Sequence, residues 1–419
     1  MNILVIGGGG REHAISLALS QSELCETLHM APGNPAMTEF GTCHKIGIED
    51  SDALFSLAQD LAPDLVVIGP EAPLVDGLAD RLTEAGIATF GPSAAAAQLE
   101  GSKDFARQIM AAHDIPQPDF KTFTNAEEAL SHALSLNGYC VIKADGLAAG
   151  KGVVVSDTMD EAGKAIIQML DGQFGSASAS ILIEERISGP EISAFALIDG
   201  KQTVWLASAQ DHKRAYDDDK GPNTGGMGAV SPSPLMTEAL RNQIMDEIIN
   251  PVAKAMDDAG TPYRGVLYAG LMLTQDGPKV IEFNCRFGDP EAEVIIPRIE
   301  NDFLALIYDL IQGKLVRADM SDDAAVTVVL ATKGYPGDYE KGSVISKLEE
   351  AGAADNVTIY HAGTAFDTGG RLVASGGRVL AVTALGDDIA TARHDAYEAV
   401  DKIEWPEGFC RRDIAKSAS

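Results

Sequence analysis

Basic residues are scarce in this sequence, and their scarcity narrows the classes of partner it could bind. The chain has 32 Lys and Arg against 62 Asp and Glu, a formal net charge of −30. Such an excess repels polyanions at long range, which argues against nucleic acid or an anionic membrane as a partner. The acidity indicates a solvated surface and does not identify a substrate. The few basic residues beside glycine-rich segments are therefore the most informative about where an anionic ligand could bind.

Long apolar runs and paired cysteines are also missing. No uninterrupted stretch of about 18 apolar residues occurs, so we expect no transmembrane helix. The start, MNILVIG, leads into a glycine cluster without the features of a signal peptide, and we expect a cytoplasmic protein. The cysteines show no CxxC pair and no zinc-type spacing, so we expect free thiols, most of them buried. They are Cys25, Cys43, Cys140, Cys285 and Cys410.

Length and hydrophobic periodicity predict several α/β units. The 419 residues exceed one usual core, and the 45% hydrophobic content is that of a globular protein. Apolar runs that end at glycine alternate with amphipathic stretches, including one helix expected from Leu74 to Ala85, which is typical of a parallel doubly wound sheet. We expect one unit over residues 1–101, a second over 102–320 with a helix–strand module at about 121–187, and a small closing unit over 321–419.

The first candidate site is the glycine cluster at residues 7–10, which follows the apolar run from Asn2 to Ile6. A dinucleotide fingerprint would place its third glycine at position 12, where this chain has Glu12, so nicotinamide binding is not expected. A glycine turn that opens a helix, with Arg11 beside it, suits a single phosphate. The alternative is that the glycines only permit a tight turn.

A second glycine-rich segment runs from Lys143 to Gly152. It is not a Walker A loop, because Gly146 and Gly150 are too close and Gly152 replaces the hydroxyl residue that binds magnesium. A loop between two antiparallel strands can close over a triphosphate with its N–H groups and Lys151, while Lys143 supplies a point charge. The alternative is a mobile hairpin with no ligand.

The third segment is the polar strand that ends at a glycine turn, VIEFNCRFGDPE. Residues two apart share a strand face, so Glu282 and Asn284 offer two oxygen ligands for magnesium while Phe283 points toward a core. Arg286 continues the polar face and could hold a phosphoryl group or a carboxylate. The alternative reading is the solvated face of an edge strand.

The fourth segment, residues 208–228, is polar and is expected to form a long irregular loop. It contains the DHKR run from Asp211 and a glycine-rich stretch from Gly221. Loops of this length are usually functional or disordered. Paired basic side chains and free amides favour an anionic substrate.

These segments together resemble the glycinamide ribonucleotide synthetase family of ATP-grasp ligases, and the similarity runs through nearly the whole chain. Further matches are APGN, GPEAPLV, QLEGSK, YAGLM and LVASGGRVL. The resemblance implies a mixed α/β and α+β ATP-grasp fold. It would comprise an N-terminal Rossmann-like domain (1–101), an ATP-grasp region (102–320) with its lid, and a C-terminal domain (321–419).

The resemblance implies an ATP site between the lid and the central sheet. Lys103 and Lys143 match positions that reach the nucleotide phosphates, and Glu191 matches the ribose position. Glu282 and Asn284 match the ligands of Mg²⁺ (or Mn²⁺). The adenine is expected at the hinge over residues 183–187. The other residues expected to bind the nucleotide are Gly150, Lys151, Gly152, Glu184, Glu185 and Ile187.

Glycine and 5-phosphoribosylamine are the other substrates that the resemblance implies, at the N-terminal glycine turn and the 208–228 segment. The candidate catalytic residues are Lys103, Lys143, Asp211, Lys213 and Arg286. The candidate substrate-binding residues are Gly9, Gly10, Arg11, Gly33, Asn34, Glu71, Asp211, Lys213, Asn223, Gly225, Gly226, Met227, Arg286 and Asp289. The chain departs from the usual family residues at Gly8, Pro190, Ala292 and Glu293.

The reaction implied by the resemblance has two steps and belongs to de novo purine synthesis. The glycine carboxylate attacks the γ-phosphate to give glycyl phosphate and ADP, and the amine then displaces phosphate. Positioning and charge neutralisation would carry the catalysis. The alternatives are another ATP-grasp carboxylate–amine ligase, a carboxylase acting on bicarbonate, and a nucleotide-binding regulator without catalysis. We expect a monomer.

Overall fold

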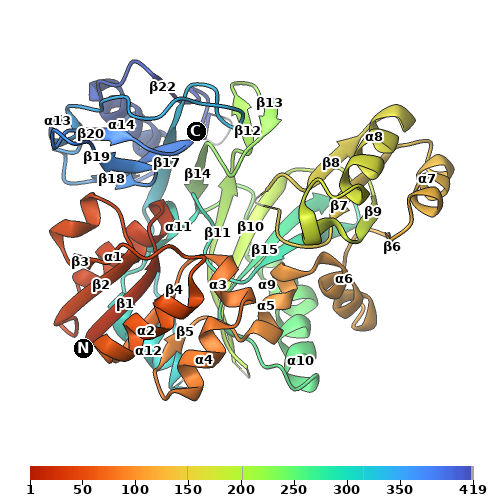
Figure 1. The fold of residues 1–419 in the computed structure, drawn as a ribbon, viewed down its shortest axis with the longest axis horizontal. Coiled ribbons are helices and arrows are strands. Elements are labelled where there is room, and N and C mark those ends of the chain that lie inside the picture. Colours follow the sequence, from red (N-terminus) through yellow and green to blue (C-terminus); the bar gives the residue numbers. More distant parts are fainter. Residues whose placement is uncertain (149, 201, 315, 417–419) are drawn as a thin grey trace.

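The structure is a computed structural model that describes residues 1–148, 150–200, 202–314 and 316–416 (Figure 1). The N-terminal part is a five-stranded sheet of order β3-β2-β1-β4-β5, in which every pairing is parallel. Its strands are β1 (Asn2–Gly7), β2 (Thr27–Pro32), β3 (Thr42–Cys43), β4 (Leu65–Ile68) and β5 (Thr89–Phe90). Strands buried on both faces read as continuous apolar runs, and the predicted parallel sheet is confirmed.

Helices cover this first sheet and lead into the next part of the chain. They are α1 (Gly10–Ser20), η1 (Ala36–Glu39), α2 (Ser51–Leu61), α3 (Glu71–Val75), α4 (Leu78–Glu84), α5 (Ala94–Gly101) and α6 (Lys103–Ala112). The single helix expected from Leu74 to Ala85 is wrong. The chain breaks between α3 and α4 at Gly77, whose φ of +85° is a left-handed conformation that glycine adopts readily.

A four-stranded antiparallel sheet of order β6-β9-β7-β8 projects from the body of the molecule (Figure 1). It is built from β6 (Phe120–Phe123), β7 (Cys140–Ala144), β8 (Val153–Ser156) and β9 (Ile181–Glu185), with α7 (Ala126–Ser135), α8 (Met159–Leu170) and η2 (Gly175–Ser178). This part, called the lid below, has its own apolar core of alanine, isoleucine and methionine side chains. The predicted antiparallel pairing around the second glycine segment is confirmed.

The central sheet has nine strands, and its order runs β16-β15-β10-β11-β14-β17-β21-β18 with β22 beside β17. The strands are β10 (Glu191–Asp199), β11 (Thr203–Asp211), β14 (Gly228–Ser231), β15 (Arg264–Thr274), β16 (Gly277–Asn284), β17 (Ala324–Thr332), β18 (Val357–His361), β21 (Arg378–Gly386) and β22 (Gly408–Phe409). Strands from beyond residue 320 therefore extend the same sheet.

Helices pack around this sheet and complete the two halves of its core. They are α9 (Glu238–Ile244), η3 (Met245–Ile249), α10 (Asn250–Asp258), α11 (Ala292–Ile295), η4 (Ile296–Arg298), α12 (Phe303–Ile311), α13 (Leu348–Ala351) and α14 (Ile389–Lys402). A separate apolar cluster joins β14, β17, β21 and α14. It gives the C-terminal part an interior of its own next to the shared strands.

The 208–228 segment is more regular than predicted. It contains a two-stranded hairpin of β12 (Arg214–Tyr216) and β13 (Lys220–Asn223). A second small hairpin, β19 (Thr364–Phe366) with β20 (Leu372–Ala374), lies in the C-terminal part. The expectation of an irregular loop is therefore wrong for the middle of the segment, because local strand pairing satisfies backbone groups that a loop would leave to solvent.

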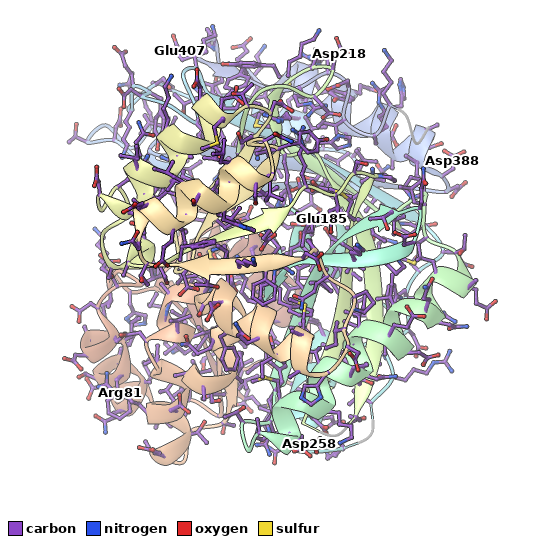
Figure 2. All side chains as sticks on the ribbon, turned by 90° about the vertical axis from the view of Figure 1, so that its right-hand side faces the viewer. Arg81, Glu185, Asp218, Asp258, Asp388 and Glu407 are labelled. Carbon is purple, nitrogen blue, oxygen red and sulfur yellow. The ribbon has the colours of Figure 1, made fainter. Side chains whose placement is uncertain are left out.

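The exposed acidic residues agree with what the composition predicted, whereas the burial of the cysteines does not. Figure 2 shows labelled acidic side chains spread around the rim of the molecule, among them Asp218, Asp258, Asp388 and Glu407, which are exposed. All five cysteines are free, but only Cys140 and Cys285 are buried, so the expectation that most are buried is wrong. Within the described residues, no helix combines the length and the apolar character that a membrane span needs.

Candidate active site

The polar face of β16 forms one wall of the candidate site. Glu282 and Asn284 are half-buried, whereas Phe283 is 3% exposed and packs in the core, as the alternation predicts. The pairing of β16 with β15 shifts between Gly270 and Leu271, which leaves Ile281 as a bulge. The Ile281 carbonyl accepts hydrogen bonds from cationic side chains of two other elements. The bulge therefore ties the metal-candidate strand to neighbouring basic groups.

Lys143, at the end of β7, lies in a buried charge cluster. Its Nζ donates to the Ile281 carbonyl at 3.0 Å and lies 2.8 Å from Oε2 of Glu184. Arg107 of α6 lies 2.8 Å from Oε1 of the same carboxylate and donates to the Val280 carbonyl. Burial raises the pKa of Glu184, but Lys143 and Arg107 together lower it below its usual value. Glu184, expected at the nucleotide, is here the anion that orients two cations.

Lys103 is the first residue of α6 and reaches the lid. Its Nζ donates to the Gly146 carbonyl at 3.2 Å, and its N–H donates to the Asp145 carbonyl at 3.0 Å. The Asp145 carboxylate accepts from Ser102, the N-cap of this helix. Burial lowers the pKa of Lys103, while the charge of Glu282 raises it. These hydrogen bonds therefore connect the N-terminus of α6, including Lys103, to the glycine segment of the lid.

Lys213 brings the 208–228 segment into the same site. Its Nζ lies 3.2 Å from Oε2 of Glu191 and 3.7 Å from Oε1 of Glu282. Burial lowers the pKa of Lys213, but Glu282 and other anions raise it well above its usual value, so the side chain is charged. Lys213, which we expected to bind a substrate, therefore bridges Glu282, the candidate metal ligand, and Glu191, the candidate ribose ligand.

The charge around Glu282 makes it suitable for a divalent cation. Burial raises its pKa, whereas Lys213, Lys143 and Lys103 lower it, so that the net pKa lies below the usual value. An ionised carboxylate next to an amide oxygen is a hard oxygen donor pair, which magnesium prefers. The residues present therefore fit the expected ion. The surrounding lysines also provide positive charge for a polyphosphate.

The remaining nucleotide candidates lie on the lid and its exit. Gly150 and Lys151 are exposed in the turn between β7 and β8, and the Gly152 carbonyl accepts from the Ala144 N–H. Gly150 has a φ of +73°. Glu185 is exposed and lies 3.8 Å from Lys279. The other two positions are the half-buried Ile187 and the exposed Glu191 at the start of β10.

Arg286 lies where the N-terminal part meets β16. Its Nη2 is 2.6 Å from Oε1 of Glu100, and its Nε is 3.2 Å from Oε2 of Glu71. The same Glu71 oxygen lies 4.0 Å from Arg11. Burial raises the pKa of Glu71, but Arg286 and Arg11 lower it to about 2. Arg286 is therefore already a bridge between two carboxylates from different helices.

The N-terminal glycine turn is enclosed by acidic groups. The Gly9 N–H donates to Oε2 of Glu12 at 2.8 Å, and the other oxygen of Glu12 lies 2.5 Å from Arg11. A Cβ atom on Gly10 would lie 2.3 Å from Oε1 of Glu293, so any larger residue at position 10 would require that carboxyl group to move. A Cβ on Gly9 would lie 3.4 Å from Oδ2 of Asp289. The glycines permit close approach of other segments as well as a tight turn.

Asn34 connects the turn to the C-terminal part. Its amide donates to the Gly8 carbonyl at 3.1 Å and to the His361 carbonyl at 2.8 Å, and its oxygen accepts from the Met37 N–H. Gly33 has a φ of +68°, and its N–H donates to the Gly7 carbonyl. Hydrogen bonds already occupy the Asn34 side chain, which positions the turn against β18.

The glycine-rich end of the 208–228 segment lies against Arg378 of β21. Arg378 donates to the Gly225 carbonyl at 2.7 Å and to the Asp289 carbonyl at 2.8 Å. A Cβ on Gly226 would lie 2.7 Å from the buried Oδ1 of Asp211, an atom without a hydrogen-bond partner among the described residues. Burial is the main cause that raises the pKa of Asp211 well above its usual value.

Two further substrate candidates, Met227 and Asn223, belong to the same segment. The Met227 side chain is 0% exposed in the C-terminal core, and its backbone N–H donates to the His212 carbonyl. Asn223 lies on the exposed strand β13, where it pairs with Arg214. These residues shape the segment that carries Asp211 and Lys213.

Several residues of the site were missed by reasoning from the sequence. Arg107 lies four residues after Lys103 on α6, on the buried face of this amphipathic helix. A charged residue on an otherwise apolar helix face was the feature of the sequence that could have identified it. Glu100 and Arg378 belong to the QLEGSK and LVASGGRVL segments but received no role. Glu293 was noted only as a departure from the family.

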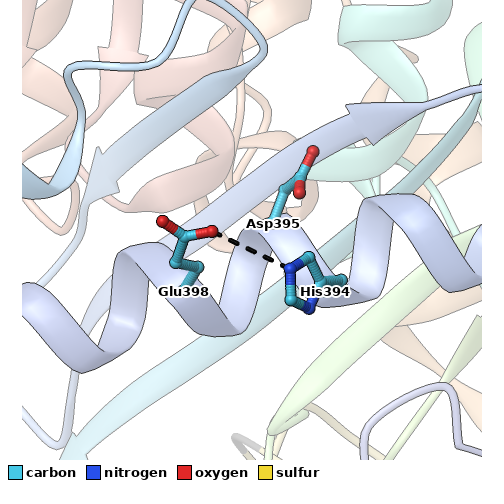
Figure 3. Close-up of side chains that lie close together, drawn as sticks. All are labelled: His394, Asp395 and Glu398. Carbon is cyan, nitrogen blue, oxygen red and sulfur yellow. Dashed lines mark ion pairs between the residues drawn. The ribbon is translucent and has the colours of Figure 1, made fainter.

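Two features outside the candidate active site have less support as functional sites. His394 and Glu398 form an exposed pair at 3.8 Å on α14, beside Asp395 (Figure 3). Asp395 already accepts from Asn356 at 2.7 Å. A cleft of about 810 Å³ beside Trp205 is lined by none of the candidate site residues.

Three family descriptions match the sequence, and together they cover most of it. Residues 1–100 match the phosphoribosylglycinamide synthetase N domain, residues 101–292 its ATP-grasp (A) domain, and residues 325–417 its C domain. The chain is 51% identical over 420 residues to a phosphoribosylamine–glycine ligase of Agrobacterium fabrum, covering 100% of this chain and 99% of the relative. A chloroplastic phosphoribosylamine–glycine ligase of Arabidopsis thaliana is 50% identical, covering 96% of this chain and 78% of the relative.

Comparison with solved structures supports the same family. A phosphoribosylamine–glycine ligase from Thermotoga maritima superposes with a TM-score of 0.85 at 33% identity, covering 99% of this chain and 100% of the other. A biotin carboxylase from Campylobacter jejuni has a TM-score of 0.75 at 15% identity, covering 97% and 93%, which shows a shared fold alone. The chain therefore belongs to the phosphoribosylamine–glycine ligase family, with an ATP-grasp fold.

Proposed function

We propose that this chain joins glycine to 5-phosphoribosylamine and converts ATP to ADP and phosphate, giving glycinamide ribonucleotide for purine synthesis. The observation that carries the proposal is that Lys213 lies 3.7 Å from Glu282, while Lys143 of the lid hairpin β7–β8 donates to the neighbouring Ile281 carbonyl. The charges of Lys213, Lys143 and Lys103 lower the pKa of Glu282 although burial raises it. Three cations around one carboxylate provide a setting for a polyphosphate and its metal ion. The relatives' names supply the two other substrates.

The nucleotide is proposed to lie between the lid and β16. Lys103 and Lys143 would neutralise its phosphates, the exposed Lys151 would approach as the hairpin closes, and Glu191 would hold the ribose. Glu282 and Asn284 would hold Mg²⁺ (or Mn²⁺), which when bound offsets negative charge on the phosphate oxygens. A hinged hairpin can also exclude water from a reactive acyl phosphate.

The first chemical step is proposed to activate glycine. Its carboxylate oxygen attacks the γ-phosphorus, the bond to the β–γ bridging oxygen breaks, and ADP leaves. The product, glycyl phosphate, has the leaving group that a free carboxylate lacks. Lys213 and Arg286 would orient the carboxylate and stabilise the charge of the transferring group.

The second step is proposed to form the amide. The amine nitrogen of 5-phosphoribosylamine attacks the acyl carbon, phosphate leaves and the nitrogen loses a proton. The phosphate ester of this substrate would bind the turn at Gly9 and Gly10 with Arg11 beside it, because a helix N-terminus and a guanidinium both favour an anion. Asp211, at the end of β11, would contact one of the amine substrates.

The experiment that tests the function is ADP release, measured with each amine substrate omitted in turn. We expect rapid release only when ATP, glycine and 5-phosphoribosylamine are all present. Release that depends on bicarbonate would support a carboxylase, and nucleotide binding without release would support a regulator. Either result would contradict the proposal.

We further propose that the protein acts as a cytoplasmic monomer of three units, residues 1–101, 102–320 and 321–419. The separate apolar cores of the lid and of the C-terminal part support more than one unit. Sedimentation of the full chain at two concentrations measures the oligomeric state.

A further inference from the structure

Glu293 is a buried carboxyl group without a partner. The residue is 1% exposed, and within the described part of the chain neither side-chain oxygen has a hydrogen-bond partner. It lies on α11, and no step of the proposed reaction uses it. Buried carboxyl groups are normally hydrogen-bonded or paired with a cation, because an isolated one is costly. The position of this group therefore calls for a function.

The carboxyl group points at the start of helix α1. The 2.3 Å separation between its Oε1 and a Cβ atom added to Gly10 places it against the backbone of the first helical residue. Asp289 borders the neighbouring Gly9 and is paired with Arg378 at 2.9 Å. Two acidic side chains therefore enclose a turn that is expected to bind an anion, and one of them is neutralised by an ion pair.

The surroundings of Glu293 favour its neutral form. Burial and the charge of Asp289 raise its pKa well above the usual value, Arg378 of β21 and the backbone N–H of Glu293 itself act in the opposite direction, and Glu291 adds a smaller increase. Burial, and in second place the charge of Glu293, raise the pKa of Tyr360 on β18, so this tyrosine of the C-terminal part lies within electrostatic range of Glu293. The N-terminus of α1 favours the ionised form by about two- to fivefold, whereas burial of an unpaired carboxylate disfavours it by roughly a thousandfold or more. The neutral form therefore prevails.

We propose that Glu293 carries a proton and donates a hydrogen bond to the phosphate ester of the amine substrate at the Gly9–Gly10 turn. It thereby selects a phosphorylated amine for the ligation. This inference rests on the proposed function, in which that turn holds the phosphate of 5-phosphoribosylamine. A protonated carboxyl group has one O–H donor, and hydrogen bonds to charged acceptors are the stronger ones. An ionised Glu293 would repel the same phosphate.

Two variants of similar size separate hydrogen bonding from space filling. Glu293→Gln keeps a neutral donor, and Glu293→Leu fills the space without one. From ADP release, we expect the KM for 5-phosphoribosylamine to stay within about twofold in the Gln variant and to rise at least about tenfold in the Leu variant. The KM values for glycine and ATP should not change in either. A KM for 5-phosphoribosylamine that rises as much in the Gln variant as in the Leu variant would overturn the inference.

A spectroscopic measurement tests the proton directly and requires only a folded Gln variant. The infrared difference spectrum between the unaltered full chain and Glu293→Gln at pH 7 should show the C=O band of a protonated carboxyl group. A carboxylate band in its place would overturn the inference while the proposed function stands.

Binding of ribose 5-phosphate, with ribose as the control, separates the inference from the proposed function. We expect ribose 5-phosphate to bind the unaltered protein and the Gln variant alike and to bind the Leu variant at least about tenfold more weakly. Equal binding to all three would overturn the role of Glu293 alone. No binding to the unaltered protein would overturn the phosphate site as well.

Discussion

The ammonium group of Lys143 lies 2.8 Å from the carboxylate of Glu184, and the two side chains are only 7% and 2% exposed. Arg107 contacts the other oxygen of that carboxylate at 2.8 Å. Two cations thus share one anion in an enclosed space, which leaves a positive charge for the nucleotide. The cluster joins α6 and the lid strands β7 and β9, so it has a structural role in addition to the nucleotide-binding role that we propose.

Replacing Arg107 should destabilise the protein more than replacing an exposed arginine. Arg107→Ala leaves Glu184 with one cation and removes hydrogen bonds to the Val280 and Ile281 carbonyls. Breaking a buried pair costs about 3–5 kcal/mol, which corresponds to a fall in Tm of about 3–6 °C for a chain of this length. Differential scanning fluorimetry of the Arg107→Ala variant and the unaltered protein measures this fall in Tm.

The matched control for Arg107 is Arg241→Ala. Arg241 forms an exposed pair with Glu238 at 3.6 Å, and such pairs contribute about 0–1 kcal/mol. We also expect a smaller fall in Tm for Lys143→Ala, because Arg107 still neutralises Glu184. Equal Tm values for the Arg107 and Arg241 variants would contradict the structural role of the cluster.

Glu282→Ala should abolish ADP formation and leave the fold intact. The side chain is 38% exposed and has no role in the core, but it supplies the ionised oxygen proposed to hold the metal. We expect a loss of at least about a hundredfold in kcat. ADP release and Tm are measured together. Glu238→Ala, at an exposed glutamate of α9, is the control, and near-normal turnover of the Glu282 variant would refute the metal site.

Arg378→Leu should impair use of the amine substrates and spare ATP. The guanidinium holds the Gly225 carbonyl and the Asp289 carboxylate, so its loss frees the segment that carries Asp211. We expect the KM of glycine or 5-phosphoribosylamine to rise about tenfold, because hydrogen bonds of a charged group contribute about 1.5–3 kcal/mol. Steady-state kinetics with each substrate varied separately measures this.

Arg371→Leu is the control on the same part of the chain, since the exposed Arg371 pairs with the half-buried Asp367 at 2.7 Å. Its kinetics should be unchanged. A parallel rise in the KM of ATP for the Arg378 variant would show general damage to the site and would count against the specific role.

Acid should remove the stabilisation that Glu71 provides. Arg286 and Arg11 overcome burial and lower the folded-state pKa of Glu71 to about 2, whereas the unfolded value is about 4.3. A depressed pKa gives stability that is fully present above the unfolded value and is lost as pH falls toward the folded value. The Tm difference between the unaltered protein and Glu71→Gln should therefore be largest above pH 5 and shrink down to pH 3. A constant difference would contradict the ion pair.

Much of the local structure could be predicted because its causes are local. Continuous apolar runs before glycine indicated the parallel strands, and the alternation around Phe283 placed Glu282 and Asn284 on one face. The break at Gly77 and the hairpin from Arg214 to Asn223 were missed, because turn conformation and strand pairing compete closely with helix and loop over a few residues. Hydrophobic periodicity does not resolve that competition.

Most of the strands and helices, the glycine turns and the residue types available for binding could be recognised from the sequence alone, since these depend on neighbours along the chain. The interaction partners of the site residues depend instead on how the sheets and helices pack together. Arg107 and Glu184 are 77 residues apart, Arg378 and Gly225 are 153 apart, and Asn34 meets His361 across 327 residues. Such contacts form because packing of whole sheets brings the groups together and excludes water. No pattern within a short window encodes that event.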